Sequence, residues 1–248
     1  IYRWAGARPE FLMNMEGTRT ILNKSYRLAE SIHAKANRLI KRVKDRVDKE
    51  WTARDEKGQV NIHPIEQLQK MKQGEWLILA RDGYRLDKLE DELKIYGYFY
   101  ERGDRTSINK RVHEAILAWE DVRRGKELDI KRVKAFYNYI KTGEGVDKKF
   151  KAMKNVDKDK TFTFDTLTSD YGLKLDKELP WFKALENIEP QKKTYVRMCL
   201  RRKENIRRAP RIKLSTIHGS KGGEADNVML LTDLTRKADA SYWKQRDE

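Results

Sequence analysis

The sequence predicts an α/β domain with a parallel sheet that is interrupted by a mostly α-helical insertion. Short apolar runs that indicate strands alternate with helical patterns at both ends of the chain, which is typical of a parallel sheet. The middle of the chain carries consecutive helical patterns with no strand between them. We therefore expect an α/β domain from residues 1–100 and 205–248, and a helical insertion from residues 101–204.

The first part of the α/β domain is expected to contain a helix, a strand and a second helix. Residues 28–47 place apolar side chains at steps of three and four between Lys and Arg, which predicts an amphipathic helix. Residues 76–80 are apolar and are followed by Arg-Asp-Gly, the pattern of a buried strand that ends in a turn. A stripe of leucines over 86–93 predicts the next helix, which Gly97 would end.

The rest of the chain separates into a helical middle and a second α/β part. Apolar side chains at helical spacing over 108–122 and 130–140 predict two consecutive helices. Residues 212–217 and 228–231 are strand candidates, and the segment between them is rich in glycine. We expect these two strands to complete the sheet.

The charge of the chain favours a polyanionic partner. The 248 residues include 55 Lys and Arg against 39 Asp and Glu, a formal charge of +16. Residues 101–210 hold 28 of the basic and 18 of the acidic side chains. Neutralising phosphates releases counterions, so nucleic acid is the first candidate partner. The alternative is a solvated surface rich in ion pairs, and the Lys- and Asp-rich stretch 154–160 is expected to be a solvated loop.

Cysteine and apolar content limit the cellular setting. One cysteine, Cys199, excludes an internal disulfide framework, and four scattered histidines argue against a structural zinc site. A reducing, cytoplasmic setting is expected. No apolar run approaches the roughly 20 residues that span a bilayer, so no membrane partner is expected. The chain begins at Ile1 rather than Met, and we expect it to be a piece of a longer protein.

Two segments near the start carry candidate ligand contacts. Tyr2 and Trp4 flank a basic side chain, and such rings can stack on unpaired bases, although an aromatic pair in a strand is also typical of a core. Tyr26 and Arg27 directly precede the first predicted helix. The planar fork of an Arg can neutralise charge on a transferring phosphoryl group. The alternative for this pair is an aromatic side chain at a helix start beside a surface cation.

Two further candidates follow predicted strands. The strand at 212–217 leads into His218-Gly-Ser-Lys221-Gly-Gly-Glu224. Glycines after a strand let backbone amides approach a phosphate, and a helix N-terminus beyond them would favour an anion. The alternative is a glycine-rich surface turn. Arg81 follows the strand at 76–80, and the alternative to a ligand contact there is a salt-bridged surface arginine.

Taken in chain order, the segments that contain Tyr2, Tyr26, Arg81 and His218 resemble the end of motif III, motif IV, the strand and helix after it, and motif V of superfamily 1A DNA helicases of the UvrD/Rep/PcrA type. The resemblance covers less than half of the chain. It implies a RecA-like, P-loop NTPase-like second motor domain with a 2B-like insertion. The DNA contacts that it implies are Tyr2, Trp4, Arg81, His218 and Lys221. The ATP contacts that it implies are Tyr26, Arg27 and Glu224, with Arg27 catalytic at the γ-phosphate.

The same resemblance implies an ATP-dependent motor of DNA replication or repair that moves 3′ to 5′ along single-stranded DNA and unwinds duplexes. ATP with Mg²⁺ would be bound mainly by a first motor domain, in a cleft whose closure moves DNA along the second. Single-stranded and tailed duplex DNA are the implied partners, and the insertion would contact duplex DNA or regulatory proteins.

The sequence also departs from the family pattern. Ala5 stands where the family has an Arg that holds the γ-phosphate, and Gly223 and Ala225 replace the apolar residues around the Glu. No Gly-x4-Gly-Lys-Ser/Thr motif occurs, since Gly125-Lys126 is followed by Glu, and no magnesium or other metal site can be assigned. The family's last Arg-bearing motif is missing as well, so the chain alone is expected to be inactive. The alternative functions are a basic helical nucleic-acid-binding module and a protein-interaction module, both without a motor.

Overall fold

The structure is a computed structural model in which residues 6, 8, 10, 11, 14–18, 20–43, 46, 49–63, 68, 71, 74–154, 156, 157 and 159–233 are described. Residues 1–65 and 66–248 form two compact units, and each unit is described by itself. The helices are α2 (Glu30–Ile40), α3 (Gly83–Ile95), α4 (Lys110–Val122), α5 (Ile130–Tyr137), α6 (Phe164–Asp170), α7 (Trp181–Ala184) and α8 (Pro190–Arg201). The strands are β1 (Trp76–Ala80), β2 (Tyr100–Arg102), β3 (Arg105–Thr106), β4 (Leu128–Asp129), β5 (Thr161–Phe162), β6 (Ile212–Thr216) and β7 (Asn227–Leu230).

The first unit contains the helix that the sequence predicts over 28–47, but α2 is shorter. It begins after Ala29, which offers no side-chain cap. At its other end, the N–H groups of Arg42 and Val43 donate to carbonyls only three residues back, at 3.1 and 3.0 Å, which is the tighter pattern of a closing turn. None of its residues is buried. A helix of this length that packs no face against a core gains little beyond its intrinsic propensity, which explains the shortening.

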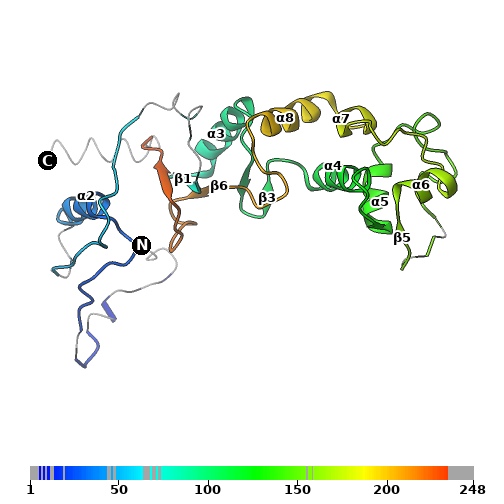
Figure 1. Cartoon of the computed structure of the whole chain (residues 1–248). Helices are drawn as coiled ribbons and strands as arrows, with labels where there is room; N and C mark the ends of the chain where they lie inside the picture. Colours follow the sequence, from blue (N-terminus) through cyan, green and yellow to red (C-terminus); the bar gives the residue numbers. More distant parts are fainter. Residues whose placement is uncertain are drawn as a thin grey trace. The chain divides into compact units, whose positions relative to one another are not determined.

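The second unit is an α/β fold with a mostly parallel, five-stranded sheet flanked by helices. The strand order is β3-β2-β6-β1-β7, and β3 alone runs antiparallel to its neighbour. The predicted strands at 76–80, 212–217 and 228–231 are confirmed as β1, β6 and β7. Figure 1 shows β1 and β6 side by side with α3 near them.

Helix α3 covers one face of this sheet, as its leucine stripe predicts. Leu86, Leu89 and Leu93 are buried against Ile78 of β1 and other core side chains. The helix begins where the Asp82 carboxylate accepts a hydrogen bond from the Arg85 amide at 3.1 Å. It ends at Gly97, whose φ of +69° is the left-handed conformation typical of a helix end. The predicted terminator is therefore confirmed.

The middle of the chain forms a helical part with its own core. The apolar stripes over 108–122 and 130–140 are buried in one cluster that also takes residues from the small β4-β5 ladder and from α6 to α8. Figure 1 shows α4, α5 and α6 grouped together, and α7 and α8 leading back toward the sheet. The sheet itself extends to Thr106 through β2 and β3. The division of the chain at residues 100 and 205 stays a prediction.

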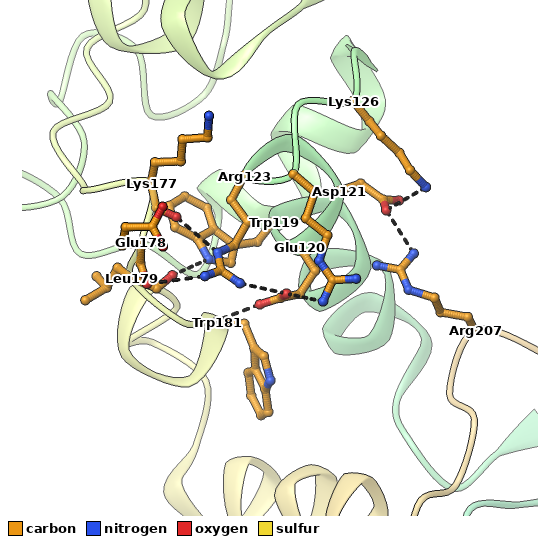
Figure 2. Close-up of polar contacts among 11 residues, drawn as sticks. Trp119, Glu120, Asp121, Arg123, Lys126, Lys177, Glu178, Leu179, Trp181 and Arg207 are labelled. Atoms are coloured by element: carbon orange, nitrogen blue, oxygen red, sulfur yellow. Dashed lines mark hydrogen bonds and ion pairs between the residues drawn. The ribbon is translucent and has the colours of Figure 1, made fainter.

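Polar contacts hold the loop before α7 onto α4 (Figure 2). The Trp119 indole donates to the Leu179 carbonyl at 3.0 Å. Arg123 donates to two further carbonyls of the same loop and to the Glu120 carboxylate. Asp121, which is buried, accepts from Lys126, Arg132 and Arg207. The Gly125-Lys126 pair thus belongs to the turn that ends α4, where Lys126 neutralises a buried carboxylate.

The two cores of the second unit meet at a polar joint. Tyr98 packs in the sheet core and the next residue, Phe99, packs in the helical core. The Arg202 guanidinium lies 3.9 Å from the centre of the Tyr98 ring, and its Nη1 donates to the Tyr98 hydroxyl at 2.8 Å. Arg211 donates two hydrogen bonds, of 2.7 and 3.2 Å, to the buried Glu204 carboxylate. The end of α8, the segment before β6 and the turn after α3 are therefore fastened together.

Across the described residues, no helix combines the length and the apolar character that crossing a membrane requires. Cys199 is buried as a free thiol in α8.

Candidate functional site

Two of the predicted DNA contacts lie at one edge of the sheet. Arg81 directly follows β1, and His218 lies two residues after the end of β6. The strands are parallel neighbours, and the Ile217 N–H donates to the Ala80 carbonyl at 2.9 Å just where both strands end. Both Arg81 and His218 are exposed. We call this place the sheet-edge site.

The topology makes this edge a favourable place for a ligand. After β1 the chain crosses to β2, and after β6 it crosses the other way to β7. Helix α3 packs on the face that carries Ile78, while the turn after β6 lies by the face that carries Leu77. Adjacent strands whose connections leave in opposite directions form a switch point, and ligands of open α/β sheets bind there at the carboxyl ends of the strands.

Lys221 lies exposed in the glycine-rich turn that follows β6. Hydrogen bonds from the Ser220 N–H to the Thr216 carbonyl (3.0 Å) and from the Gly219 N–H to Thr216 Oγ1 (3.1 Å) hold the start of this turn. A Cβ on Gly219 would lie 2.9 Å from the Ser215 hydroxyl, so a larger residue there would require that hydroxyl to move. His218 and Lys221 thus project from a turn whose backbone is held by its own hydrogen bonds.

The expected helix N-terminus beyond the glycines is wrong. Residues 217–222 form turns, and the chain continues without a helix to β7. Ten residues, 217–226, connect β6 to β7, fewer than the dozen or more of a usual helical crossover between parallel strands. The turn after β6 therefore supplies no helix N-terminus, and an anion beside it would depend on side chains and turn amides.

Glu224 lines a cavity of about 260 Å³ beside the same turn. The cavity also contains Lys213, Ser215 and Ser220, and Lys213 pairs with Glu101 of β2 at 3.2 Å. None of the three predicted DNA contacts of this unit lines it. Lys213 and Ser215 are not among the candidates that the sequence predicts. A sequence signal for them exists: they alternate with Ile212 and Leu214 of β6, and alternate residues of a strand face opposite sides of the sheet.

Tyr26 and Arg27 belong to the first unit. The Tyr26 ring is 79% exposed, with the Lys24 ammonium 6.0 Å from its centre, and Arg27 is exposed too. The Ser25 hydroxyl accepts hydrogen bonds from the Arg27 and Leu28 amides at 3.4 and 3.1 Å. The Ser25 N–H donates to the Thr52 carbonyl at 2.8 Å. A local turn therefore presents both predicted ATP contacts at the surface of their unit.

The remaining predicted contacts, Tyr2 and Trp4, lie outside the described residues, as does Ala5. Among the described residues, no group of three or more His, Cys, Asp and Glu side chains is placed to hold a metal ion.

Comparisons of the chain with models of protein families, with curated proteins and with solved structures found no match. The resemblance to helicases therefore rests on the four ordered segments of the sequence alone.

Proposed function

We propose that this chain is the C-terminal half of a superfamily 1A DNA helicase of the UvrD/Rep/PcrA type, with a RecA-like second motor domain and a 2B-like helical insertion. The intact enzyme would couple ATP hydrolysis to 3′–5′ translocation on single-stranded DNA and to duplex unwinding. The observation that carries the proposal is the meeting of Arg81 and His218 at one sheet edge. They come from distant segments of the sequence, and each segment separately resembles a helicase motif.

The chemistry of the sheet-edge site suits the backbone of a DNA strand. Arg81 and Lys221 supply exposed cations, and the His218 imidazole can donate a hydrogen bond to a phosphate or a base. Phosphate contacts of this kind fix the position of a strand without reading its sequence, which a translocating motor requires. The net charge of +16 adds long-range attraction for the same ligand.

The predicted ATP contacts fit a nucleotide that is held mainly by another domain. The cavity beside Glu224, at about 260 Å³, is smaller than the roughly 300 to 1,000 Å³ of complete small-ligand sites. It suits a contact to one part of a nucleotide, such as the ribose. ATP would supply the free energy for movement, and a first motor domain would hold its phosphates and Mg²⁺. Tyr26 would stack on the base and Arg27 would reach the γ-phosphate.

A first experiment tests the DNA face. Binding of the full chain to a labelled single-stranded oligonucleotide would be measured by fluorescence anisotropy across a salt series. Lys221→Gln should weaken binding and reduce the slope of log K against log salt by about 0.7, the value for one lost phosphate contact on a single strand. The control is Lys88→Gln, which removes an exposed lysine of α3. Equal effects of the two substitutions would contradict a DNA contact at Lys221.

A second experiment tests the motor. The first motor domain of a UvrD/Rep-type helicase would be supplied as a separate chain, and DNA-stimulated ATPase activity would be measured. Activity should appear only with both chains, and Arg27→Lys should lower it by about a thousandfold, because a lysine cannot reproduce the planar fork at the γ-phosphate. DNA binding should be unchanged by this variant. DNA binding without any restored ATPase would favour a nucleic-acid-binding module without a motor, and absence of DNA binding would favour a protein-interaction module.

A further inference from the structure

The helical part contains a second cavity, of about 500 Å³, far along the chain from the sheet-edge site. This volume lies within the range of roughly 300 to 1,000 Å³ that is typical of small-ligand sites. Its lining residues are Lys149, Phe150, Lys154, Val156, Asp157, Lys160 and Tyr171. We call it the lysine cavity.

Two aromatic rings form a fixed wall of the lysine cavity. Phe150 and Tyr171 are half-buried and meet edge to face, with ring centres 5.9 Å apart. Tyr171 packs in the same manner on the buried Phe162, at 5.1 Å. A Cβ on Gly172 would lie 2.7 Å from the Phe150 ring, so only a glycine lets this ring sit so close to the backbone. Because packing holds both rings, a planar ligand would meet a surface that is already ordered.

Three lysines surround these rings. The Lys149 ammonium lies 5.2 Å from the centre of the Phe150 ring, and the Lys160 ammonium lies 5.2 Å from that of Tyr171. Among the described residues, no carboxylate lies within 4.0 Å of the ammonium groups of Lys149, Lys154 or Lys160, which together face a single acidic lining residue. An ammonium group over a ring is weakly held and can move to a phosphate.

Lys151 lies in the same segment but has a structural role. The Lys151 ammonium donates to the backbone carbonyls of Tyr137 and Asn138, at 2.6 and 3.3 Å, and to that of Ile140. It neutralises the C-terminal end of α5, and burial lowers its pKa below the usual value. Among the described residues, no backbone carbonyl accepts a hydrogen bond from the three cavity lysines, and Lys160 interacts instead with the Tyr171 side chain. All three lysines are exposed at the cavity that they line.

We propose that the lysine cavity binds one unpaired nucleotide of a nucleic-acid strand, with the base against Phe150 and Tyr171 and the adjoining phosphates on the three lysines. A bare phosphate would leave the rings unused, and an uncharged aromatic ligand would leave the lysines unused. Stacking on a protein ring needs a base that is free of its own pair. The inference goes beyond the proposed function because no motor residue takes part, and it rests on that function only for the choice of DNA as the strand.

The charge of the cavity is tested with matched triple variants of the full chain. The cavity variant replaces its three lysines with glutamine. The control variant replaces three exposed lysines outside the cavity: Lys110→Gln, Lys131→Gln and Lys183→Gln. The cavity variant should bind a single-stranded oligonucleotide at least tenfold more weakly than the control, with a salt slope smaller by about 2, because three contacts of about 0.7 each are lost. Equal affinities of the two variants would overturn the proposal.

The rings are tested with a fluorescent base. An oligonucleotide that carries 2-aminopurine should lose fluorescence on binding, as its base stacks in the cavity. Phe150→Leu keeps an apolar side chain but removes the ring, and it should weaken binding roughly tenfold and abolish this quenching while the salt slope is unchanged. Tyr171→Leu serves as a second variant, and circular dichroism verifies that both remain folded. Quenching that is unchanged in both folded variants would overturn the stacking.

Competition between ligands shows whether the cavity binds a free nucleotide, a single strand or a duplex. Comparing the variants shows whether the lysine cavity or the sheet-edge site binds DNA. If free dAMP restores the 2-aminopurine fluorescence, and if this displacement depends on the cavity lysines, the cavity is supported as a nucleotide site. Blunt duplex that binds as tightly as a single strand, with the same dependence on the cavity lysines and none on the rings, would overturn it. If Lys221→Gln weakens binding and the cavity variants do not, the inference fails and the motor proposal stands. The reverse pattern supports the inference and removes the sheet-edge contact.

Discussion

Replacing Asp121 by asparagine should destabilise the helical part of the chain, because this buried carboxylate neutralises three cations. It accepts from Arg132 at 2.6 Å and from Arg207 at 2.9 Å, and Lys126 lies 3.1 Å away (Figure 2 shows the Lys126 and Arg207 contacts). Only 7% of the Asp121 side chain is exposed. Asparagine keeps the shape but loses the charge, so three cations would face a neutral amide.

The expected loss follows from the burial of each partner. Breaking a fully buried ion pair costs about 3 to 5 kcal/mol, and a hydrogen bond to a charged group contributes about 1.5 to 3 kcal/mol. The Arg132, Arg207 and Lys126 side chains are 37%, 38% and 62% exposed, so water compensates part of the change. We expect the free energy of unfolding to fall by about 2 kcal/mol.

The effect should depend on pH. Burial alone would raise the pKa of Asp121, but hydrogen bonds from Arg132 and Lys126 and the charge of Arg207 together hold it below its usual value. A depressed folded-state pKa gives stability that is complete above the unfolded value of about 3.9 and is lost as the pH falls through the folded value. The difference between the original chain and Asp121→Asn should therefore be largest near neutral pH and shrink in acid.

Urea unfolding, followed by far-ultraviolet circular dichroism and tryptophan fluorescence at several pH values, measures this difference. The control is Asp104→Asn, an exposed aspartate in the turn between β2 and β3, which should change little. A double-mutant cycle with Arg207→Gln should give a coupling of about 1 kcal/mol. A loss for Asp121→Asn no greater than that for the control, or one that does not vary with pH, would refute the reasoning.

Three further predictions concern the joint between the cores and its surroundings. Gly97→Ala should cost about 3 kcal/mol by urea unfolding, because φ is +69° and the new Cβ would lie 2.8 Å from a side-chain atom on α8. Gly103→Ala, at φ +58° with open space around it, should cost only about 1 kcal/mol, and equal losses would contradict the steric argument. Tyr195→Phe should lower stability by about 1 kcal/mol, since the hydroxyl lies 2.6 Å from Ser107 Oγ and from a backbone carbonyl; no change would show that these contacts are replaced by water. Burial raises the pKa of the Cys199 thiol to about 12. At pH 8 this thiol should therefore react with a thiol reagent at least about a hundredfold more slowly in the folded chain than in the unfolded chain. Rapid labelling of the folded chain would contradict the burial of Cys199.

Elements with a clear local apolar pattern were predictable from the sequence. The strand at 76–80 has the predicted bounds, and the helical stripes over 108–122 and 130–140 are buried as expected. Their spacing alone determines which face is apolar, whatever they pack against. The order of the strands was not predictable, because β6 pairs between β2 and β1 through contacts between distant segments. The short, mixed sequence of β2, residues 100–102, gives no strand pattern of its own.

The same distinction between local patterns and contacts of distant segments applies to the candidate sites. The sequence identified Arg81 and His218 as separate candidates, and only the parallel pairing of their strands brings them to one edge. The stretch 154–160 was interpreted as a solvated loop, since its Lys and Asp content resembles one. The lysine cavity arises because the described residues Lys154, Val156, Asp157 and Lys160 line it together with Phe150 and Tyr171, and composition carries no information about such an arrangement.

The joint between the two cores determines how the proposed sites could act together. Rotating the helical part relative to the sheet would have to separate the Arg202 guanidinium from the Tyr98 ring, or break the two hydrogen bonds between Arg211 and the buried Glu204. Breaking the Arg211 hydrogen bonds would leave the buried Glu204 carboxylate without this charged partner, which costs more than losing an exposed contact. Phe99 opposes the same movement by packing in the helical core next to Tyr98 in the sheet core. A strand held at both the sheet edge and the lysine cavity would therefore be held at a fixed spacing, and movement along it would require one site to release before the other.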